Sequence, residues 1–271
     1  MTVLTRIGKR WSKSADWLHG WFFAAIVLPL HRFMKKPIRD ISAFQRRIPF
    51  IERREYSHNG EDGIIAAIFG MIGVTNRFCV EFGVEDGTES NTRYLVAKKG
   101  WTALWMDGGD WPSDKKVRRE FITAENIQTL FVTYGVPETF DLLSIDIDGN
   151  DYWVWKAIER YRPRVVIIEY NAHIPPDESK TIPYDPAFHW DGTDYFGASL
   201  LALKKLGEEK GYRLIGTDRN GVNAFFVEAA LVQGCFDPTP WPEMFHPPAF
   251  KGKVGQGHPP DLRKRPWVQV L

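Results

Sequence analysis

The segment that decides the fold is Val80-Glu81-Phe82-Gly83-Val84-Glu85-Asp86-Gly87. An apolar run over 77–82 leads into it and ends at Gly83, which is the pattern of a buried strand. Helical spacing of apolar residues follows over 88–99 and ends at Gly100. Glycines between a strand and a helix let the backbone approach a ligand closely, and the helix N-terminus offers unpaired N–H groups. We therefore expect a ligand site at this turn.

Short apolar runs alternate with helical segments on both sides of this turn. The runs predict strands at 101–106, 129–133, 141–147, 164–170, 212–217 and 223–228, and the helical spacing predicts helices at 115–121, 151–161 and 196–210. The last two strands are separated by Asp218-Arg219-Asn220-Gly221, whose Asn-Gly pair is typical of a tight reversal. This order predicts an α/β fold with a doubly wound, mostly parallel, seven-stranded sheet. Five parallel strands closed by a hairpin is the plan of class I methyltransferases, and a generic Rossmann domain is the alternative.

The acids of the glycine turn indicate which ligand suits it. Glu85 and Asp86 would repel a pyrophosphate, and a dinucleotide site wants G-x-G-x-x-G without acids. S-adenosylmethionine presents an ammonium and a sulfonium, so an acidic loop favours it. An ordinary strand–helix turn without a ligand is the structural alternative.

A second candidate lies about twenty residues further on, where the next strand ends at Asp107-Gly108. In a doubly wound nucleoside site, a carboxylate at this place accepts hydrogen bonds from the ribose hydroxyls. Asp107 can instead cap a helix or be a solvated loop acid. Its position at a strand end and its spacing from Gly83 favour the ribose role.

The fourth predicted strand ends in Ser144-Ile145-Asp146-Ile147-Asp148-Gly149-Asn150-Asp151. Neighbouring carboxylates raise one another's pKa or recruit a cation, so Asp146 is a candidate base, a neighbour of a sulfonium or a metal ligand. Asp151 we assign to capping the next helix.

The fifth predicted strand ends in Glu169-Tyr170-Asn171-Ala172-His173. Asp146, Glu169 and Asn171 form a hypothetical oxygen-ligand set for Mg²⁺, and pairing of Glu169 with a cation such as Arg164 is the alternative. His173 is our candidate for the general base, because a neutral imidazole readily takes a proton from a hydroxyl. His189 and His58 are its rivals.

The first 55 residues carry most of the positive charge. They contain twelve Lys or Arg and four Asp or Glu, whereas the whole chain has a net charge of +1. That balance gives no case for a nucleic-acid partner. The apolar run over 17–30 has fourteen residues, fewer than the ~20 that a membrane-spanning helix needs. Its aromatic residues and flanking cations suit a helix lying on an anionic membrane, and docking on the protein's own core is the alternative.

From these features we expect three regions. They are a basic, aromatic, helical arm over 1–55, an α/β domain over 56–237, and a Pro-rich C-terminal strap over 238–271. Residues 11–36 would make the peripheral membrane contact. Two cysteines are too few for a disulfide framework, and Cys79 lies in an apolar run as a buried thiol would. A reducing, cytoplasmic location follows from the cysteines, and the sequence does not indicate an oligomeric state.

Five motifs in this order resemble the FkbM-like methyltransferases. The motifs are Ser57-His58-Asn59-Gly60-Glu61-Asp62-Gly63, Val80–Gly87, Ser90-Asn91-Thr92, Leu104-Trp105-Met106-Asp107-Gly108 and Leu143–Gly149, and the resemblance as a whole spans residues 56–228. The resemblance implies S-adenosylmethionine-dependent O-methylation of a sugar, glycolipid or secondary-metabolite hydroxyl.

The resemblance also assigns cofactor-binding residues. Glu81, Gly83 and Gly87 would line the methionine part, and Asp107 with Gly108 the ribose. Asn59, Glu61 and Asp62 would fold over the cofactor. The turn reads G-V-E-D-G instead of the more usual G-x-G-x-G, which is a departure from the family pattern at the methionine end.

Three functions fit the pattern, and the first is the methyltransferase. Such an enzyme works chiefly by aligning an acceptor oxygen with the methyl group, with Asp146 or His173 taking the proton. The loop over 171–194 is rich in aromatic residues and suits a small-molecule or glycan acceptor. The alternatives are a non-catalytic nucleoside-binding or membrane-associated module and an NAD-dependent oxidoreductase.

Overall fold

A computed structural model describes residues 44–112, 116–232, 241–249 and 252–271. The proposed membrane-contacting segment over 11–36 lies outside these residues, as does Cys235. The arm over 1–55 is described only from residue 44 on, where Phe44 and Ile48 are buried. Ile48 belongs to the short helix α4 (Ile48–Ile51), which packs Ile48 and Ile51 into the domain core and leaves Phe50 exposed.

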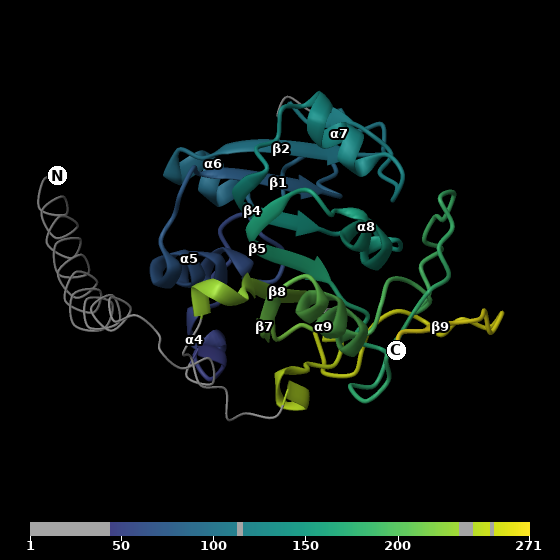
Figure 1. The fold of residues 1–271 in the computed structure, drawn as a ribbon. Helices are drawn as coiled ribbons and strands as arrows, with labels where there is room; N and C mark the ends of the chain where they lie inside the picture. Colours follow the sequence, from purple (N-terminus) through teal and green to yellow (C-terminus); the bar gives the residue numbers. More distant parts are fainter. Residues whose placement is uncertain (1–43, 113–115, 233–240, 250–251) are drawn as a thin grey trace, which may run out of the picture. The chain divides into compact units, whose positions relative to one another are not determined.

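The central sheet has seven strands in the order β3-β2-β1-β4-β5-β8-β7 (Figure 1). Their bounds are β1 Phe78–Phe82, β2 Thr102–Asp107, β3 Arg118–Arg119, β4 Thr139–Ile145, β5 Arg162–Glu169, β7 Tyr212–Thr217 and β8 Asn223–Glu228. β3, β2, β1, β4 and β5 are mutually parallel, and β8 runs antiparallel to both of its neighbours. The expected doubly wound sheet with a terminal hairpin is confirmed.

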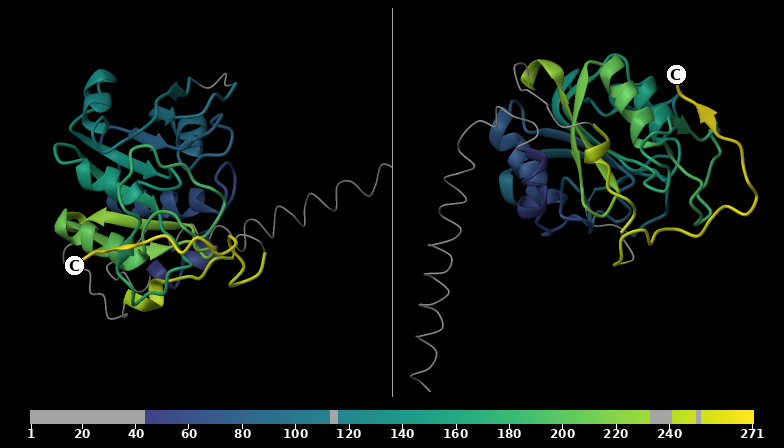
Figure 2. Two further views of the ribbon diagram at one scale, coloured as in Figure 1. Left: turned by 90° about the vertical axis from the view of Figure 1, so that its right-hand side faces the viewer. Right: turned by 90° about the horizontal axis from the view of Figure 1, so that it is seen from below.

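Helices cover both faces of the sheet, and the core is therefore split in two (Figures 1 and 2). On one face lie α7 Ile127–Thr133, α8 Asp151–Ala157 and α9 Leu200–Glu209, and on the other α4, α5 Glu61–Ile72 and α6 Arg93–Lys99. Val-Val-Ile-Ile over 165–168 is fully buried because the two layers cover β5 on both sides. Cys79 is likewise buried, and burial raises the pKa of its thiol.

Two predicted elements were wrong. Residues 129–133 belong to a helix, because Ile127, Leu130 and Phe131 bury one face at helical spacing while Val132 is exposed. The helix expected at 115–121 is instead the two-residue strand β3, which pairs with Met106 and Asp107. The pairing of β3 with β2 is a tertiary contact, which the local spacing of apolar residues does not predict.

The segment after β8 packs along loops of the domain. It includes the 3₁₀ helices at Ala229–Val232 and Trp241–Met244, and it ends in β9 (Val268–Gln269), which pairs with β6 (Lys180–Thr181). Thr217 donates its hydroxyl hydrogen to the Met244 carbonyl, and Tyr195 donates to the Pro266 carbonyl. Among its described residues the only strand is β9, which fits the low pairing capacity of a proline-rich segment.

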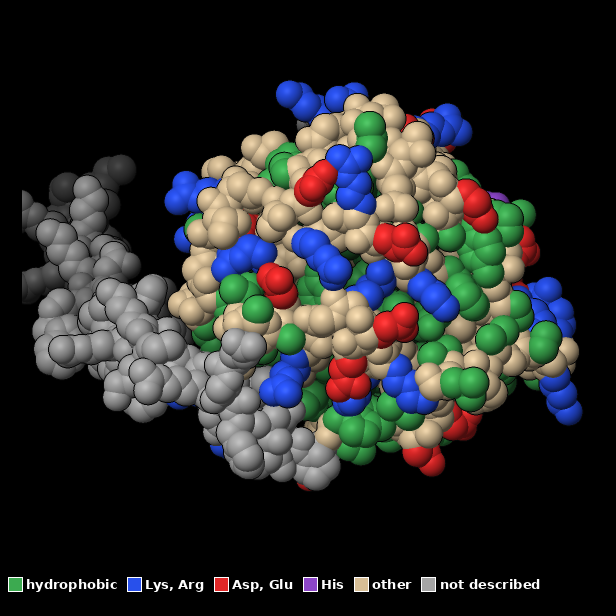
Figure 3. All heavy atoms as spheres, viewed as in Figure 1, with side chains coloured by type: hydrophobic (Ala, Val, Ile, Leu, Met, Phe, Trp, Pro, Cys, Tyr) green, Lys and Arg blue, Asp and Glu red, His purple; other side chains and the backbone are tan. Residues whose placement is uncertain are grey.

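The face seen in Figure 1 carries charges of both signs. Figure 3 shows that Lys and Arg are interspersed there with Asp and Glu. Within the described ranges, none of the helices has the length and apolar character to cross a bilayer.

A buried ion pair fixes the amino ends of the central strands. The Asp141 carboxylate on β4 accepts N–H groups of Thr75, Asn76 and Arg77, and it pairs with the guanidinium of Arg164 on β5 at 2.8 Å. Arg164 also donates to the carbonyls of Ile72 and Gly73, at the end of α5. These hydrogen bonds lower the pKa of Asp141 and join α5, β1, β4 and β5.

We predict that Arg164→Ala strongly destabilises the fold, by about 3–5 kcal/mol, because it leaves the Asp141 carboxylate buried without its charge partner. Urea unfolding measures this change. The matched control is Arg160→Ala, which removes an exposed pair with Glu138 and should cost less than about 1 kcal/mol. Equal effects of the two substitutions would contradict the anchoring role of the Asp141–Arg164 pair.

Candidate functional site

The carboxyl ends of the parallel strands open into a cavity of about 570 Å³. Its walls come from the turns after β1, β2, β4 and β5 and from the start of β8. Nine carboxylates line it, and no Lys or Arg does among the residues that the structure describes. The nine acids are Glu61, Glu81, Glu85, Glu89, Asp107, Glu120, Asp146, Asp148 and Glu169.

Most of the predicted site residues meet at this cavity. Those that line it are Asn59, Glu61, Glu81, Gly83, Asp107, Gly108 and Asp146. Asp62, Gly87 and His173 are not among its lining residues. The first group comes from four separate elements, so the fold brings together residues that are up to 87 positions apart in the sequence.

Gly83 is required by the close approach of two strand ends. It has a φ of 71°, and a Cβ built on it would lie 1.5 Å from the carbonyl oxygen of Asp146. Any side chain here would force β1 and β4 apart. The glycine therefore sets Asp146 directly beside the first turn, and this contact shapes the middle of the cavity.

Gly87 stabilises the turn after β1 and is not among the residues that line the cavity. Its φ is 74°, and its N–H donates to the Val84 carbonyl at 2.7 Å. Glu85 also has a positive φ, 49°, which is uncommon for a residue with a side chain. Between two glycines, this conformation brings Glu85 to the cavity wall.

Glu81 lines the cavity, but the protein itself uses its carboxylate. One oxygen accepts the N–H of Asn91, and the other accepts both the N–H and the hydroxyl of Thr92. The same Thr92 hydroxyl receives the indole N–H of Trp105. Despite these bonds, burial raises the pKa of Glu81 to about 6. Its clearest role is to hold the start of α6 against β1.

Asp107 ends β2 and is already a hydrogen-bond acceptor. Its oxygens accept the N–H groups of Glu85 and Gly109 and the indole N–H of Trp111. An ionised carboxylate has about four lone-pair sites, so little acceptor capacity is left for two ribose hydroxyls. Trp111 is 46% exposed and is the partner that can move away.

The 57–63 motif forms a tight loop before α5. The Asp62 carboxylate accepts the N–H groups of Glu55, Tyr56 and Ser57, so Asp62 shapes the loop and does not face the cavity. Glu61 accepts both N–H donors of Asn59 and the amide N–H of Asn223. Asn59 and Glu61 thus join the loop to the start of β8.

Three acids meet between the ends of β4 and β5. Asp146, Asp148 and Glu169 each bring one oxygen within 4.8 Å of the others. Burial, followed by the charge of the neighbouring acids, raises the pKa of Asp146 and of Glu169 well above their usual ranges. Such a set can hold a cation. Asn171 does not complete it, since its Nδ2 donates to the Asp194 and Phe196 carbonyls and its oxygen accepts the His173 N–H.

Two further sequence interpretations need correction. Asp151 does not cap α8 as expected, because it is the first residue of the helix and its carboxylate accepts the N–H groups of Ile147 and Gly149. It closes the turn that presents Asp148, whose φ is 55°. His173 lies at a second cavity of about 200 Å³, where its Nε2 accepts the His258 N–H. Its place in the fold does not suit the predicted role of base.

Aromatic side chains form one wall of the main cavity. Phe121 and His189 stack with ring centroids 5.3 Å apart, and Phe188 lies so close to Gly149 that a Cβ there would be 2.4 Å from its ring. Trp190 completes this wall. The wall residues at 188–190 belong to the long loop that was expected to meet an acceptor.

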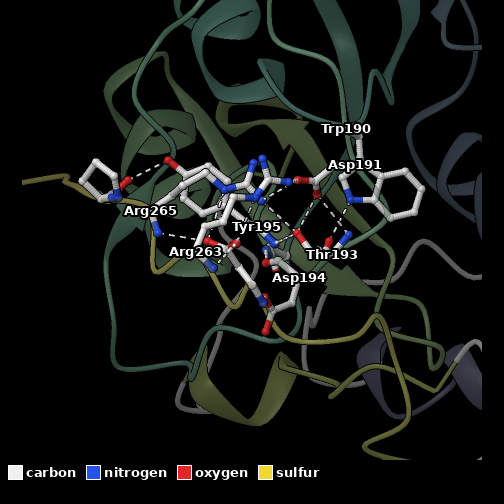
Figure 4. Close-up of polar contacts among 10 residues, drawn as sticks. Trp190, Asp191, Thr193, Asp194, Tyr195, Arg263 and Arg265 are labelled. Carbon is white, nitrogen blue, oxygen red and sulfur yellow. Dashed lines mark hydrogen bonds and ion pairs between the residues drawn. The ribbon is translucent and has the colours of Figure 1, made fainter.

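The C-terminal segment holds this wall in place (Figure 4). Next to Trp190, Asp191 forms ion pairs with both Arg263 and Arg265. Arg265 also binds Asp261 and the Thr193 hydroxyl, and its guanidinium lies 4.0 Å from the centre of the Tyr195 ring. A side chain far along the sequence thereby fixes the loop that carries the wall.

Sequence reasoning missed several cavity residues. Trp111 lies between β2 and β3, Phe121 lies just after β3, and Asn150 and Asn223 lie at the starts of α8 and β8. Asn150 and Asn223 follow glycine-containing turns in the sequence. A polar residue at such a turn, on the carboxyl edge of the sheet, was the signal that could have predicted a place in the cavity. The aromatic pair gave no local signal.

The sheet order, the glycine turn and the acidic edge define a methyltransferase of class I. Residues 71–214, more than half of the chain, match the profile of the methyltransferase FkbM domain. The chain belongs to this family. A comparison with curated proteins finds no match to it.

Three solved structures are similar to parts of the chain. They are a sarcosine dimethylglycine methyltransferase from Galdieria sulphuraria (15% identity, TM-score 0.32, covering 56% of this chain and 60% of that one), the CMeT domain of the citrinin polyketide synthase (11%, 0.31, 64% and 54%) and a SAM dependent methyltransferase from Aquifex aeolicus (9%, 0.29, 68% and 97%). The chain therefore spans less than two thirds of the length of the first two. At these TM-scores the three structures add nothing to the family assignment.

The buried acids predict that stability falls as the pH rises from 6.5 to 8.5. Burial, with the charge of Glu61, raises the pKa of Asp218 to about 8, and Asp146 and Glu169 shift in the same direction. A carboxyl with a raised pKa binds its proton more tightly in the folded chain, so the stability that protonation gives is lost as the pH passes the folded-state pKa. The lowered pKa of His246 acts below about 6.5, outside this window.

Thermal unfolding of the chain without ligand should show this as a decrease in Tm on the order of 5 °C over that interval. Asp218→Asn should flatten the curve. A Tm that rises with pH between 6.5 and 8.5 would contradict the assignment of raised pKa values.

The contacts of Arg265 predict that Arg265→Ala loosens the aromatic wall. Loss of its charge-assisted hydrogen bonds, typically worth about 1.5–3 kcal/mol, should speed amide exchange over residues 188–196 by roughly tenfold or more. Hydrogen–deuterium exchange with mass spectrometry measures this. Arg213→Ala, on β7, is the control and should leave that segment unchanged. Unchanged amide exchange over residues 188–196 in the Arg265 variant would show that the loop is ordered without Arg265.

Proposed function

We propose that the chain is an S-adenosylmethionine-dependent O-methyltransferase acting on a hydroxyl of a sugar, glycolipid or secondary metabolite. The observation that carries this proposal is the single acidic cavity at the carboxyl edge of the sheet, with Gly83, Asp107 and Asp146 among its lining residues. When bound, S-adenosylmethionine supplies an electrophilic methyl group on a sulfonium, which becomes a neutral thioether after transfer to oxygen.

The cavity fits this cofactor in size and charge. Cavities of about 300–1,000 Å³ commonly hold cofactors, and this one has about 570 Å³. Its carboxylates attract an ammonium or sulfonium and repel the pyrophosphate of a dinucleotide. The absence of Lys and Arg from the described lining removes the usual partners of phosphates. These facts favour a methyl donor over NAD.

Residues on β1 and β2 would hold the donor. The exposed Gly83 backbone leaves room for a close approach, and Asp107 with Gly108 would bind the ribose once the Trp111 indole releases its oxygen. Asn59 and Glu61 border the same cavity from the loop before α5. Asp62 and Gly87 would act only by shaping the loops that carry these groups.

Asp146 is the residue that we propose as general base. It lines the cavity at the end of β4, between the donor side on β1 and β2 and the end of β5. Its raised pKa brings the carboxyl closer to the working pH, which is the condition for an efficient base. The carboxylate would take the hydroxyl proton as the oxygen–methyl bond forms. Holding the acceptor oxygen in line would supply most of the rate enhancement.

The aromatic wall supports a non-anionic acceptor. Phe188 and Trp190 present ring surface to the cavity, against which the apolar face of a sugar or a hydrophobic metabolite can pack. Carboxylates nearby accept hydrogen bonds from hydroxyl groups. Both features fit a hydroxyl-bearing acceptor, small molecule or glycan.

Two substitutions separate donor binding from catalysis. Asp107→Ala should weaken S-adenosylmethionine binding by about 10–100-fold, because hydrogen bonds to a charged group contribute about 1.5–3 kcal/mol. Asp146→Asn should lower kcat by roughly 10²–10⁴-fold and change donor affinity far less. Calorimetry gives the affinities, and transfer of a tritiated methyl group to a glycan panel gives the rates.

The control is Asp110→Asn, an exposed acid three residues after Asp107 whose partner is Arg119. It should behave as the unmodified chain does. Tight binding of NAD without binding of S-adenosylmethionine would overturn the proposal. Donor binding without transfer to any acceptor would favour the non-catalytic module instead.

A further inference from the structure

The end of the cavity at β5 and β8 is chemically different from the donor end. Glu169 is the last residue of β5, and it is paired in register with Asn223, the first residue of β8. Asn150, which precedes α8, borders the same cavity. Neighbouring strands lie about 4.8 Å apart, so β8 is roughly 19 Å from β2 across the order β2-β1-β4-β5-β8. The cavity is therefore long enough to receive an acceptor beside the donor.

Three oxygens of cavity-lining residues, two of them at this end, have no hydrogen-bond donor among the described residues. They are Oδ1 of Asn150, Oδ1 of Asn223 and Oε2 of Glu169. Asn150 is 5% exposed and Asn223 is 2% exposed, so bulk solvent gives little compensation. All three side chains line the cavity.

The amide orientations follow from their partners. Nδ2 of Asn223 donates to the Glu61 carboxylate at 2.9 Å, and Nδ2 of Asn150 donates to the Asp185 carbonyl at 2.7 Å. Both partners are acceptors only, so the remaining amide oxygen of each asparagine must itself be an acceptor. The cavity therefore presents two unpartnered acceptors at the β5–β8 end, on Glu169 and Asn223, and a third on the turn before α8, and a ligand with several donors suits them.

Charge narrows the class of ligand further. Glu61, Glu81 and Asp107 already receive donors from the protein, whereas Asp146, Asp148 and Glu169 have no hydrogen bond or ion pair in the part of the chain that is described. S-adenosylmethionine carries two positive charges and one negative charge, a net charge of +1. One such charge does not balance three adjacent carboxylates, so the site retains attraction for a second cation.

We infer that the methyl acceptor carries a protonated amine, as an amino sugar or another amino alcohol does, and that the amine is held at the β5–β8 end by Glu169 and Asn223, with Asn150 offering a further acceptor in the same cavity. An ammonium offers three N–H donors and one positive charge, which suit the acceptor oxygens of Glu169 and Asn223 and the surplus negative charge. The ammonium has no lone pair while it is held there. It therefore anchors the acceptor, and a hydroxyl of the same molecule remains the nucleophile.

This inference rests on the proposed function and makes it narrower. Acceptors that carry a phosphate or carboxylate near the reacting hydroxyl are excluded by the same carboxylates. A neutral sugar keeps the hydrogen bonds of its hydroxyls but loses the charge interaction. The order of affinity should therefore be amino sugar, then neutral sugar, then sugar phosphate.

Binding of simple sugars to the full chain tests this order. The chain is saturated with S-adenosylhomocysteine in EDTA, and glucosamine, glucose and glucose 6-phosphate are titrated separately with ligand-observed NMR. We expect glucosamine to bind at least tenfold more tightly than glucose, with glucose 6-phosphate the weakest. Glu169→Gln should remove most of the glucosamine advantage and leave S-adenosylhomocysteine binding intact, which shows that the variant is folded.

Glu228→Gln is the matched control, since Glu228 is at the opposite end of β8 and outside the cavity lining. It should keep the full preference for glucosamine. Equal binding of the three sugars, or strongest binding of glucose 6-phosphate, would overturn the inference. Sugar binding that occurs only when Mg²⁺ replaces EDTA would also overturn it, because the acids would then serve a metal. Failure of S-adenosylhomocysteine to bind the unmodified chain would instead contradict the proposed function.

Discussion

The contact between Gly83 and the Asp146 carbonyl is the constraint on which the site depends. No side chain fits between them, so the ends of β1 and β4 meet directly at the middle of the carboxyl edge. The turn after β1 and the acids after β4 consequently border one cavity. Buried hydrogen bonds then fix each side of this contact. Glu81 holds the start of α6, and Asp151 closes the turn that presents Asp148.

The same edge concentrates negative charge that the protein leaves only partly compensated. Both oxygens of Asp151 and one oxygen of Asp62 accept backbone N–H groups, and these acids shape loops, whereas Asp146 and Glu169 keep their oxygens for the cavity. Burial raises the pKa of the latter two, so ionising these acids costs free energy. A cationic ligand removes that cost. Stability and ligand charge are thereby linked in this fold.

The amino ends of the central strands contain buried interactions that stabilise the fold. Asp141 on β4 and Arg164 on β5 form a buried, hydrogen-bonded pair near the amino ends of these strands, joined to the loop before β1 and to the end of α5. Buried charged groups are therefore hydrogen-bonded at the amino edge of the sheet and left partly unpaired at the carboxyl edge. Such a departure from full pairing is typical of a ligand site. The C-terminal segment adds a further restraint through Arg265, which positions the loop of the aromatic wall.

The sequence by itself determined the alternation of strands and helices, the terminal hairpin, and the position of Gly83, Asp107 and Asp146 at strand ends, because periodicity and glycine turns are local properties. Tertiary structure alone decided which polar groups face the cavity. The motif acids Asp62 and Glu81 were expected to bind the cofactor, but nearby N–H groups of the protein occupy one oxygen of Asp62 and both oxygens of Glu81. His173 lies at a second cavity, where it contacts the C-terminal segment. Asn223 lies next to Glu169 because β5 and β8 pair in antiparallel register. Such contacts depend on which distant segments pack together, and local spacing carries no information about them.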